Sequence, residues 1–274
     1  MTKGAGQATK RSVETHAPFF ESAVVLRLIE RKLTFKPTAE DHGGLAAIPH
    51  QRIEFGHEFG MRLDGVFVDN GSASIVLFTH GNRHNITRFR EHYHLFTSIG
   101  QSFFTFDYPG YGRSPGTPSE ELTYASARAA YAYVNKSLGF QPEKIVSYGC
   151  SMGGAVAIEL MQHAQVACLI TESTFTNSWE MAKHLYPYFP VWPLLPKRFR
   201  NDEKVPRVKV PFLIIHGEAD PIVPARMATQ LFNSATSQAR IVIVPEANHI
   251  DSLARGGESL QLQIRQFIET NTSA

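Results

Sequence analysis

Residues 146–160 read VSYGCSMGGAVAIEL, and the interpretation of the whole chain depends on this stretch. A β-branched and aromatic run leads to Gly149, and an alanine-rich apolar run follows Gly153, which indicates a buried strand that turns directly into a helix. Glycine permits a sharp turn and close backbone packing, so the hydroxyl of Ser151 between these glycines is expected to project from the turn. The stretch therefore makes Ser151 a candidate nucleophile, with an ordinary tight turn as the alternative.

The rest of the chain alternates short apolar strands with amphipathic helices. Strands are expected at 74–81, 102–110, 144–151, 166–173, 211–217 and 240–248, and helices at 87–100, 119–139, 152–164, 224–235 and from about 257 to 269. Two earlier strand-like runs, 51–60 and 61–70, follow each other without a helical pattern, which predicts an antiparallel start to the sheet. The alternation predicts an α/β fold with a mostly parallel, doubly wound sheet of about eight strands.

The domain organisation follows from this uninterrupted pattern. We expect a single domain over residues 18–274, preceded by a disordered tail at residues 1–17 and carrying a short helical lid inserted at about 174–207. The segment 18–34 is amphipathic, and its interspersed charges exclude a membrane-spanning helix. It is interpreted as a helix packed on the domain, with peripheral membrane contact as the alternative.

Charge and cysteine content narrow the partners and the compartment. The 27 Lys and Arg residues nearly balance the 25 Asp and Glu residues, which gives no electrostatic reason to expect a nucleic-acid partner. Cys150 and Cys168 both lie in apolar runs and are expected to be buried small hydrophobic residues rather than a disulfide. A reducing compartment is preferred for such a chain, and we expect a cytoplasmic protein.

A serine hydroxyl needs a base and an orienting acid before it becomes a good nucleophile. Asp220 stands in GEADPIVP directly after one predicted strand, and His249 stands in NHID after the next. Because parallel strands end at the same edge of a sheet, these side chains are expected to meet Ser151 there, in the chain order serine, acid, histidine. Glu218 is the alternative acid, and Asp220 is preferred because it lies further into the turn. The sequence therefore predicts Ser151, Asp220 and His249 as catalytic residues.

The other histidines are assigned to structural or surface positions. His80 and His84 form an H-x-x-x-H pattern, but its second position is glycine rather than the glutamate of a zinc protease, so no metal site is expected. His92 and His94 are expected on a polar, solvated helix face, and His216 lies inside a strand. No cofactor is expected either.

Acyl transfer also needs hydrogen-bond donors for the oxyanion of the tetrahedral intermediate. The backbone N–H of Met152, the residue after the serine, would supply one donor at a helix N-terminus. The loop HGN after an early strand would supply the second donor, from Asn82. An oxyanion hole formed by Asn82 and Met152 is therefore predicted.

Six short motifs carry a family resemblance, and they occur in this order: FTHGN, FDYPGYGRS, YGCSMGG, ESTF, LIIHGEADPIVP and ANH. Together they resemble the α/β-hydrolase superfamily, and within it the alpha/beta-hydrolase domain-containing serine hydrolases, over about residues 32–270. The resemblance implies an α/β-hydrolase fold and an esterase, lipase or depalmitoylase activity. Many such relatives carry an N-terminal membrane helix, which is not expected here, and Cys150 stands where related lipases often have histidine.

The lid insertion is rich in aromatic residues and is expected to lie beside the nucleophile. Trp179, Tyr186 and Trp192 would offer an apolar wall to an acyl group, and the same residues would equally serve to pack the lid onto the domain. The predicted function is hydrolysis of carboxylic esters or thioesters of small to medium acyl groups through an acyl-enzyme on Ser151. An aminopeptidase-like serine peptidase, a long-chain lipase or protein depalmitoylase, and a non-catalytic scaffold are the alternatives.

Overall fold

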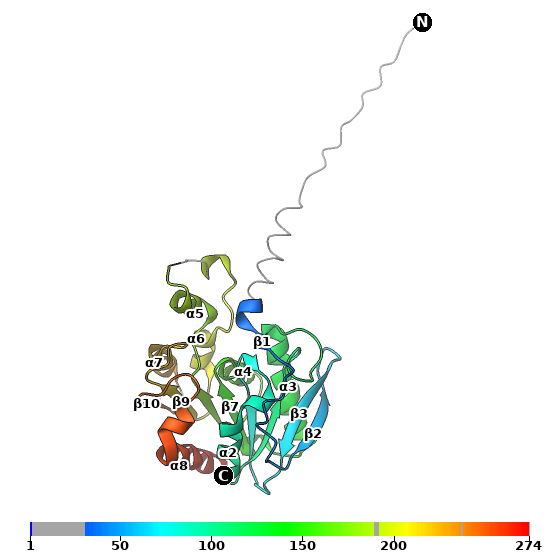
Figure 1. Ribbon diagram of the computed structural model, residues 1–274, viewed down its shortest axis with the longest axis vertical. Helices are drawn as coiled ribbons and strands as arrows, with labels where there is room; N and C mark the ends of the chain where they lie inside the picture. The colour runs from blue at the N-terminus through cyan, green and yellow to red at the C-terminus, as the bar shows by residue number, and fades with distance from the viewer. Residues whose placement is uncertain (2–30, 189–191, 237, 274) are drawn as a thin grey trace.

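The computed structural model describes Met1 and residues 31–188, 192–236 and 238–273 (Figure 1). The predicted tail at 1–17, apart from Met1, and most of the predicted helix at 18–34 lie outside these ranges and stay predictions. Within the described residues, no helix is long and apolar enough to cross a membrane.

Strands and helices alternate along most of the described chain. The strands are β1 Lys36–Pro37, β2 Gln51–Gly56, β3 Arg62–Val68, β4 Ile75–Thr79, β5 Arg83–His84, β6 Ser102–Phe106, β7 Ile145–Cys150, β8 Cys168–Glu172, β9 Phe212–Gly217 and β10 Ala239–Val244. The α-helices are α2 Arg90–Ser98, α3 Glu120–Lys136, α4 Met152–Leu160, α5 Ser178–Leu185, α6 Asn201–Lys204, α7 Ala225–Ser234 and α8 Ser252–Thr272. Short 3-10 turns lie at Ile86–Arg88, Pro142–Lys144, Trp192–Leu194 and Val205–Arg207.

Eight of these strands form one sheet in the order β10-β9-β8-β7-β4-β6-β3-β2. Strand β3 is antiparallel to both β2 and β6, and every other neighbouring pair in this sheet is parallel. β1 and β5 form a separate two-stranded pair. The mostly parallel sheet with an antiparallel start confirms the predicted α/β fold.

Helices cover both faces of the sheet, which is why its central strands are apolar on both sides. In β4, Val76 and Phe78 pack in the same core as residues of α2 and α8, whereas Ile75 and Leu77 pack with residues of α3 and α4. Helix α7 packs with α4 on this second face. The sheet therefore separates two apolar layers, and its strand ends remain at the edges of the sandwich.

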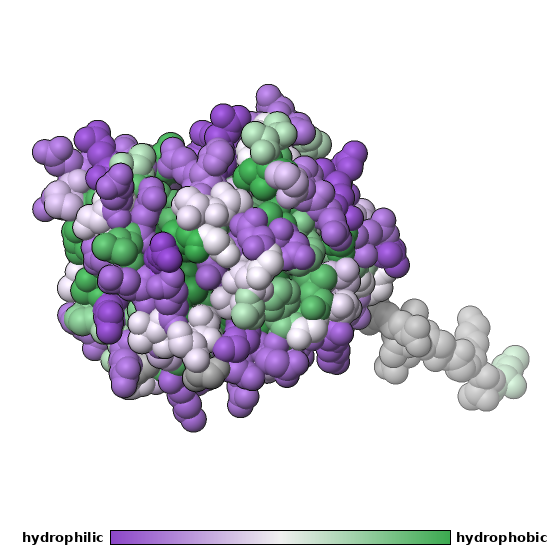
Figure 2. All heavy atoms as spheres, turned by 90° about the horizontal axis from the view of Figure 1, so that it is seen from below, coloured by the Kyte–Doolittle hydropathy of each residue, from purple (hydrophilic) through white to green (hydrophobic). Residues whose placement is uncertain are grey.

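The end of the molecule opposite α5 is mainly hydrophilic. Figure 2 views this end and shows hydrophilic side chains over most of it, with hydrophobic side chains in smaller areas among them. Several exposed large apolar residues belong instead to the lid and to the loops after β9 and β10: Leu185, Tyr186, Tyr188, Ile222 and Ile250. These loops begin at the carboxyl ends of the strands, where the predicted catalytic residues also lie.

Two expectations about helices are wrong. His92 is buried rather than solvated, because α2 packs against both the sheet and α8 and therefore buries a wide face; His94 is exposed. Helix α8 begins at Ser252, earlier than the expected start near Gly257. The backbone of Gly257 has φ +52° and kinks the helix there. The sequence pattern therefore predicted the helix from this kink onward and missed the turn before it.

Candidate active site

Ser151 forms the turn between β7 and α4. It directly precedes the first residue of α4, with φ +55° and ψ −118°. Residues other than glycine seldom adopt this left-handed backbone and keep it only where the surroundings enforce it. The N–H of Ser151 donates to the carbonyl oxygen of Glu172 at 2.7 Å, and its own carbonyl oxygen accepts from the N–H of Gly154 at 3.0 Å. These contacts hold a strained strand-to-helix elbow at the position that the sequence indicates.

Three glycines let the elbow fit against its neighbours. A Cβ atom at Gly149 would lie 2.3 Å from the carbonyl oxygen of Gly153, and one at Gly153 would lie 1.9 Å from the carbonyl oxygen of Thr79. A Cβ atom at Gly154 would lie 1.8 Å from Thr174 Oγ1. All three distances are too short for real Cβ contacts. A side chain at Gly149 or Gly153 would push α4 away from β7 or β4, and one at Gly154 would push it away from the loop after β8.

A chain of two hydrogen bonds joins the three predicted catalytic side chains. His249 Nε2 lies 3.0 Å from Ser151 Oγ, and His249 Nδ1 lies 2.7 Å from Asp220 Oδ2. The other oxygen of Asp220 accepts the N–H groups of Ile222 and Val223, each at 2.9 Å, which fixes the carboxylate. Because Asp220 accepts only, Nδ1 carries the proton, and Nε2 is left to accept a proton from the serine hydroxyl.

Asp220 is held in its charged form. Burial works against ionisation, but hydrogen bonds from His216 and His249, the charge of His249 and the N–H of Val223 outweigh it and lower the pKa of Asp220 well below its usual range. The alternative acid, Glu218, is exposed and directs its carboxylate to the backbone of the loop after β10. Of the two acids, Asp220 is therefore the one that meets His249.

The loop after β4 brings Asn82 beside the elbow. A Cβ atom at the preceding Gly81 would lie 3.5 Å from Ser151 Cβ and 3.6 Å from the carbonyl oxygen of Cys150, so the two segments are in van der Waals contact. Among the acceptors that the structure describes, none receives the backbone N–H of Asn82 or of Met152. The N–H of Met152 also lies at the N-terminus of α4, the positive end of the helix dipole. Both groups are available to an oxygen atom bound next to Ser151.

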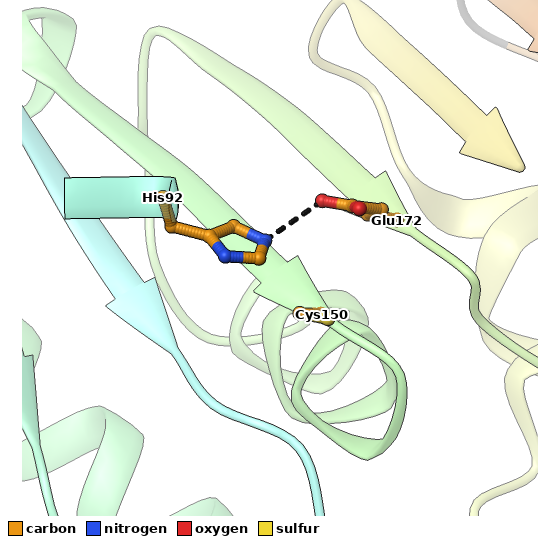
Figure 3. Close-up of side chains that lie close together, drawn as sticks. All are labelled: His92, Cys150 and Glu172. Atoms are coloured by element: carbon orange, nitrogen blue, oxygen red, sulfur yellow. Dashed lines mark hydrogen bonds and ion pairs between the residues drawn. The ribbon is translucent and has the colours of Figure 1, made fainter. Parts of the chain in front are cut away.

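A buried polar cluster lies beside the elbow, formed by His92, Tyr148, Cys150 and Glu172. Figure 3 shows the imidazole of His92 directed at the carboxylate of Glu172, with Cys150 close by. His92 Nε2 and the hydroxyl of Tyr148 each lie 2.8 Å from Glu172 Oε2. Burial opposes ionisation of Glu172, but His92, Tyr148 and the charge of His249 together lower its pKa. A fixed negative charge therefore lies next to the elbow.

The same cluster supplies the one group of three potential metal ligands found in the described ranges: His92, Cys150 and Glu172. Two ligand atoms of a tetrahedral zinc ion lie about 3.3 Å apart when each is about 2.0 Å from the metal, whereas the nitrogen of His92 and the oxygen of Glu172 are 2.8 Å apart. Burial also raises the pKa of the Cys150 thiol well above its usual value, which disfavours the thiolate that a metal needs. The geometry fits a hydrogen-bonded cluster better than a metal centre.

The sequence pattern did not assign Glu172 or His216 to this site. Glu172 ends a strand, CLITE, that is otherwise without charge, and a buried charge needs partners, so its place at a strand end was a usable signal. His216 was placed in a strand interior, and its Nε2 lies 3.4 Å from Asp220 Oδ2. No local pattern shows that a strand histidine faces an acid on the loop that follows it.

Contacts within the lid hold its two tryptophans. The indole N–H of Trp179 donates to the carbonyl oxygen of Leu195 at 2.9 Å, and Lys183 Nζ lies 5.9 Å from the centre of the Trp192 ring. Trp179 also lines a surface cavity of about 310 Å³ with residues of α6 and α7, and the lining includes none of the predicted catalytic residues. Trp179 therefore contributes to packing of the lid.

The lid meets the predicted catalytic residues at the C-terminal end of α5. His184 Nε2 lies 3.0 Å from the carbonyl oxygen of Pro221, the residue after Asp220. Tyr186 follows two residues later and is 40% exposed. In the part of the chain that the structure describes, no hydrogen bond or ring contact joins Trp179, Tyr186 or Trp192 to Ser151, so their contact with substrate stays a prediction.

Family models and curated relatives match most of the chain. A model described as the alpha/beta hydrolase family matches residues 76–203, and one described as TAP-like protein matches residues 189–273. The uncharacterized protein Rv2307c of Mycobacterium tuberculosis is 34% identical over 76% of this chain and 75% of its own length. The alpha/beta hydrolase domain-containing protein aho-3 of Caenorhabditis elegans is 30% identical over 84% of this chain and 71% of its own length.

Solved structures of esterases have the same fold. Esterase Pf2001 of Pyrococcus furiosus covers 87% of this chain and 98% of its own with a TM-score of 0.73, at 17% identity. A thermophilic esterase from Thermogutta terrifontis covers 81% of this chain and 99% of its own with a TM-score of 0.62, at 19% identity. At these identities the likeness concerns the fold.

Proposed function

The chain belongs to the α/β-hydrolase family, and on that premise we propose that it is a serine hydrolase acting on carboxylic esters or thioesters of small to medium acyl groups. The observation that carries the proposal is the hydrogen-bonded chain from Ser151 through His249 to Asp220, with distances of 3.0 and 2.7 Å. A serine hydroxyl alone is a weak nucleophile, and this arrangement is the one that activates it. The esterase fold neighbours support the same reaction class.

In the proposed reaction, His249 Nε2 accepts the hydroxyl proton of Ser151 while Oγ attacks the carbonyl carbon of the substrate. Asp220 keeps its hydrogen bond to Nδ1 and stabilises the imidazolium. The N–H groups of Asn82 and Met152 bind the oxyanion of the tetrahedral intermediate. His249 then protonates the leaving alcohol or thiol as its bond to the carbonyl carbon breaks. Water, deprotonated by His249, finally attacks the acyl-enzyme and releases the carboxylic acid and free Ser151.

The preference for small to medium acyl groups rests on the lid. Of the three aromatic residues predicted to line the acyl group, Trp179, Tyr186 and Trp192, we place Tyr186 along it, because the described contacts favour Tyr186 most. It lies at the end of α5 that touches the loop carrying Asp220, whereas Trp179 is hydrogen-bonded within the lid. A short lid anchored next to the acid leaves room for a limited acyl length.

A long-chain lipase or protein depalmitoylase is the second candidate. Ile222 lies two residues after Asp220, Ile250 directly follows His249, and both are exposed, as is Tyr188 in the lid. Exposed apolar side chains close to an active site suit a long acyl chain. Peripheral membrane contact through residues 18–34 would likewise suit an enzyme whose substrate lies in a membrane. An aminopeptidase and a non-catalytic scaffold have no comparable observation in their favour.

Two free, buried cysteines suit the reducing cytoplasm that we propose as the compartment. Cys150 and Cys168 are both buried and unpaired, and neither is available as an exposed thiol. A disulfide framework, the usual sign of an oxidising compartment, is not formed by them.

A substrate panel tests the proposed function. We expect purified protein to hydrolyse p-nitrophenyl acetate and butyrate and the matching acyl thioesters, and to leave aminoacyl p-nitroanilides intact. Ser151→Ala should abolish all of this turnover, which excludes a contaminating hydrolase. Turnover of the anilides alone would favour the peptidase, and inertness toward every class would favour the scaffold.

A further inference from the structure

One peptide unit links the buried side chain of His80 to the predicted oxyanion hole. The carbonyl oxygen of Gly81 and the N–H of Asn82 belong to the same planar amide. His80 Nδ1 lies 2.8 Å from that carbonyl oxygen. A carbonyl oxygen only accepts, so Nδ1 carries the proton and donates it. A hydrogen bond to the oxygen of an amide polarises it and makes its N–H a stronger donor.

The other ring nitrogen of His80, Nε2, faces the carboxyl of Asp107. His80 and Asp107 are both completely buried, and His80 Nε2 lies 3.5 Å from Asp107 Oδ1. Burial lowers the pKa of His80 to about 3 and raises the pKa of Asp107 to about 7. Below that pH the carboxyl of Asp107 therefore keeps its proton and faces the lone pair of a neutral imidazole. His80 Nε2 has no hydrogen-bond partner among the described atoms, and Asp107 Oδ1 at 3.5 Å is the polar group that faces it.

Further hydrogen bonds fix the backbone on both sides of this amide. The hydroxyl of Tyr108 donates to the carbonyl oxygen of His80 at 2.9 Å, and the hydroxyl of Tyr111 donates to that of Asn82 at 2.8 Å. Asp107 Oδ1 accepts the N–H of Ile86 at 2.9 Å, further along the same loop. The segment that follows β6 therefore holds the loop that follows β4.

We propose that His80, backed by Asp107, is a positioning residue that orients and polarises the Gly81–Asn82 amide, so that the N–H of Asn82 is a strong and fixed donor to the oxyanion. This positioning role rests on the proposed function, because it takes Asn82 as an oxyanion donor. His80 itself touches neither substrate nor nucleophile.

Two isosteric substitutions separate the two polar contacts of His80. An asparagine amide nitrogen can occupy the place of Nδ1, so His80→Asn keeps the donor to Gly81 and loses the contact with Asp107. A glutamine amide group reaches the place of Nε2, where its oxygen can accept from the protonated carboxyl of Asp107, so His80→Gln keeps a polar group beside Asp107 and loses the donor to Gly81. His94→Gln, at an exposed position on α2, is the matched control.

Steady-state kinetics on p-nitrophenyl butyrate give the first readout. Loss of a whole oxyanion donor lowers kcat about 100-fold to 1000-fold, and a weakened donor should cost less. We expect His80→Gln to lower kcat about tenfold to hundredfold with an unchanged KM, because the oxyanion exists only after attack. His80→Asn should stay within about threefold of wild type, and His94→Gln should match wild type. Equal kcat values for His80→Asn and His80→Gln would overturn the proposal.

Nuclear magnetic resonance gives a second readout that needs no turnover. Gly81–Asn82 is the single Gly-Asn step in the sequence, so labelling glycine carbonyl carbons with ¹³C and asparagine nitrogens with ¹⁵N yields one amide signal for this peptide. We expect this signal to move in His80→Gln toward the shifts of an unbonded carbonyl and to stay near wild type in His80→Asn.

The two readouts distinguish failure of this proposal from failure of the proposed function. If wild type hydrolyses no ester, the proposed function fails, and the amide signal still shows whether His80 binds this peptide. If wild type is active but the signal is identical in His80→Gln and wild type, the positioning role is wrong. Thermal unfolding of each variant shows whether a change in the signal reflects loss of the fold.

Discussion

At the scale of single residues, Ser151 is held in a left-handed backbone that it would not adopt in an ordinary turn. Its φ of +55° costs energy that the surrounding contacts must supply, and such strain is typical of positions that present a side chain for chemistry. The hydroxyl lies within hydrogen-bond distance of His249, whose other nitrogen meets Asp220. The roles we propose for these residues lead to predictions about the two acids of one turn.

Asp220→Asn and Glu218→Gln form a matched pair, because each removes one charge from the same turn. Asparagine in place of Asp220 would favour the wrong tautomer of His249, and the corresponding change in a serine protease lowers kcat about 10⁴-fold. We expect a loss of about 1000-fold or more in kcat for Asp220→Asn, measured on p-nitrophenyl butyrate, and wild-type activity for Glu218→Gln. The reverse result would identify Glu218 as the acid.

Asp107 gives a prediction about stability and pH. Around it lie His80 and these further titratable or charged groups: Asp64, Arg52, Tyr93, Tyr108 and Tyr111. Its folded-state pKa is raised to about 7, so as pH rises from about 4 the unfolded chain loses this proton first and the folded state loses stability. Relative to Asp107→Asn, wild type should lose about 3 kcal/mol between pH 4 and pH 7. Urea unfolding at several pH values measures the difference, and a constant offset between the two proteins would contradict the prediction.

The sequence could predict which side chains lie together where each directly follows a strand, and it could not predict contacts with a partner that is distant in the chain. Ser151, Asp220 and His249 each follow a predicted strand, so their meeting could be expected. His92 was placed in solvent because nothing near it in sequence indicates a partner, yet its ring meets Glu172, which is far away along the chain. Burial of a histidine depends on such a partner, and the helix pattern alone does not contain it.

At the scale of elements, the junction of β7 and α4 depends on glycines rather than on favourable side chains. A Cβ atom at Gly153 would collide with the carbonyl oxygen of Thr79, whereas one at Gly56 in β2 would meet nothing within 4 Å. Gly153→Ala should therefore lower the free energy of unfolding by about 3 kcal/mol or more, and Gly56→Ala should change it by no more than about 0.5 kcal/mol. Chemical denaturation of the two variants measures both. Equal stabilities would show that the elbow tolerates a side chain.

The lid leads to a prediction about acyl length. Each buried methylene contributes about 0.8 kcal/mol, so kcat/KM should rise about fourfold per methylene through the short p-nitrophenyl esters and then flatten or fall. Tyr186→Ala should move this break toward longer chains, whereas Trp179→Ala should destabilise the lid without moving it. A kcat/KM that keeps rising to the palmitoyl ester would contradict the proposal and favour the lipase or depalmitoylase.

The sequence pattern placed most helices and strands, and it missed a helix start where a glycine within the helix resembles a boundary. The alternation of strands and helices predicted a mostly parallel sheet, since each parallel pair needs a crossover of helical length. The order of the strands within the sheet was not predicted. The first turn of α8 was missed because Gly257, whose backbone is non-helical, suggests a helix boundary, while Leu253 before the kink and Leu260 after it both pack in the core. The lid is irregular, and its contacts with the domain could not be derived from periodicity.

At the scale of the whole molecule, the strand order explains why residues so far apart in sequence meet. β7, β9 and β10 are parallel members of one sheet, so the loops that carry Ser151, Asp220 and His249 all leave it at the same edge. The loop with Asn82 leaves from β4, the neighbour of β7, and completes the arrangement. The same architecture is found in esterases at 17% to 19% identity, which shows that the fold survives when most side chains differ.

Covalent labelling with a fluorophosphonate shows whether Ser151 is an activated nucleophile. We expect one adduct per wild-type chain by intact-protein mass spectrometry, located on the peptide that contains Ser151, and slower labelling of His249→Ala because the base is missing. Ser151→Ala should remain unlabelled while it unfolds at the wild-type temperature. Full labelling of Ser151→Ala, or an adduct on another residue of the wild type, would show that Ser151 is not the activated nucleophile.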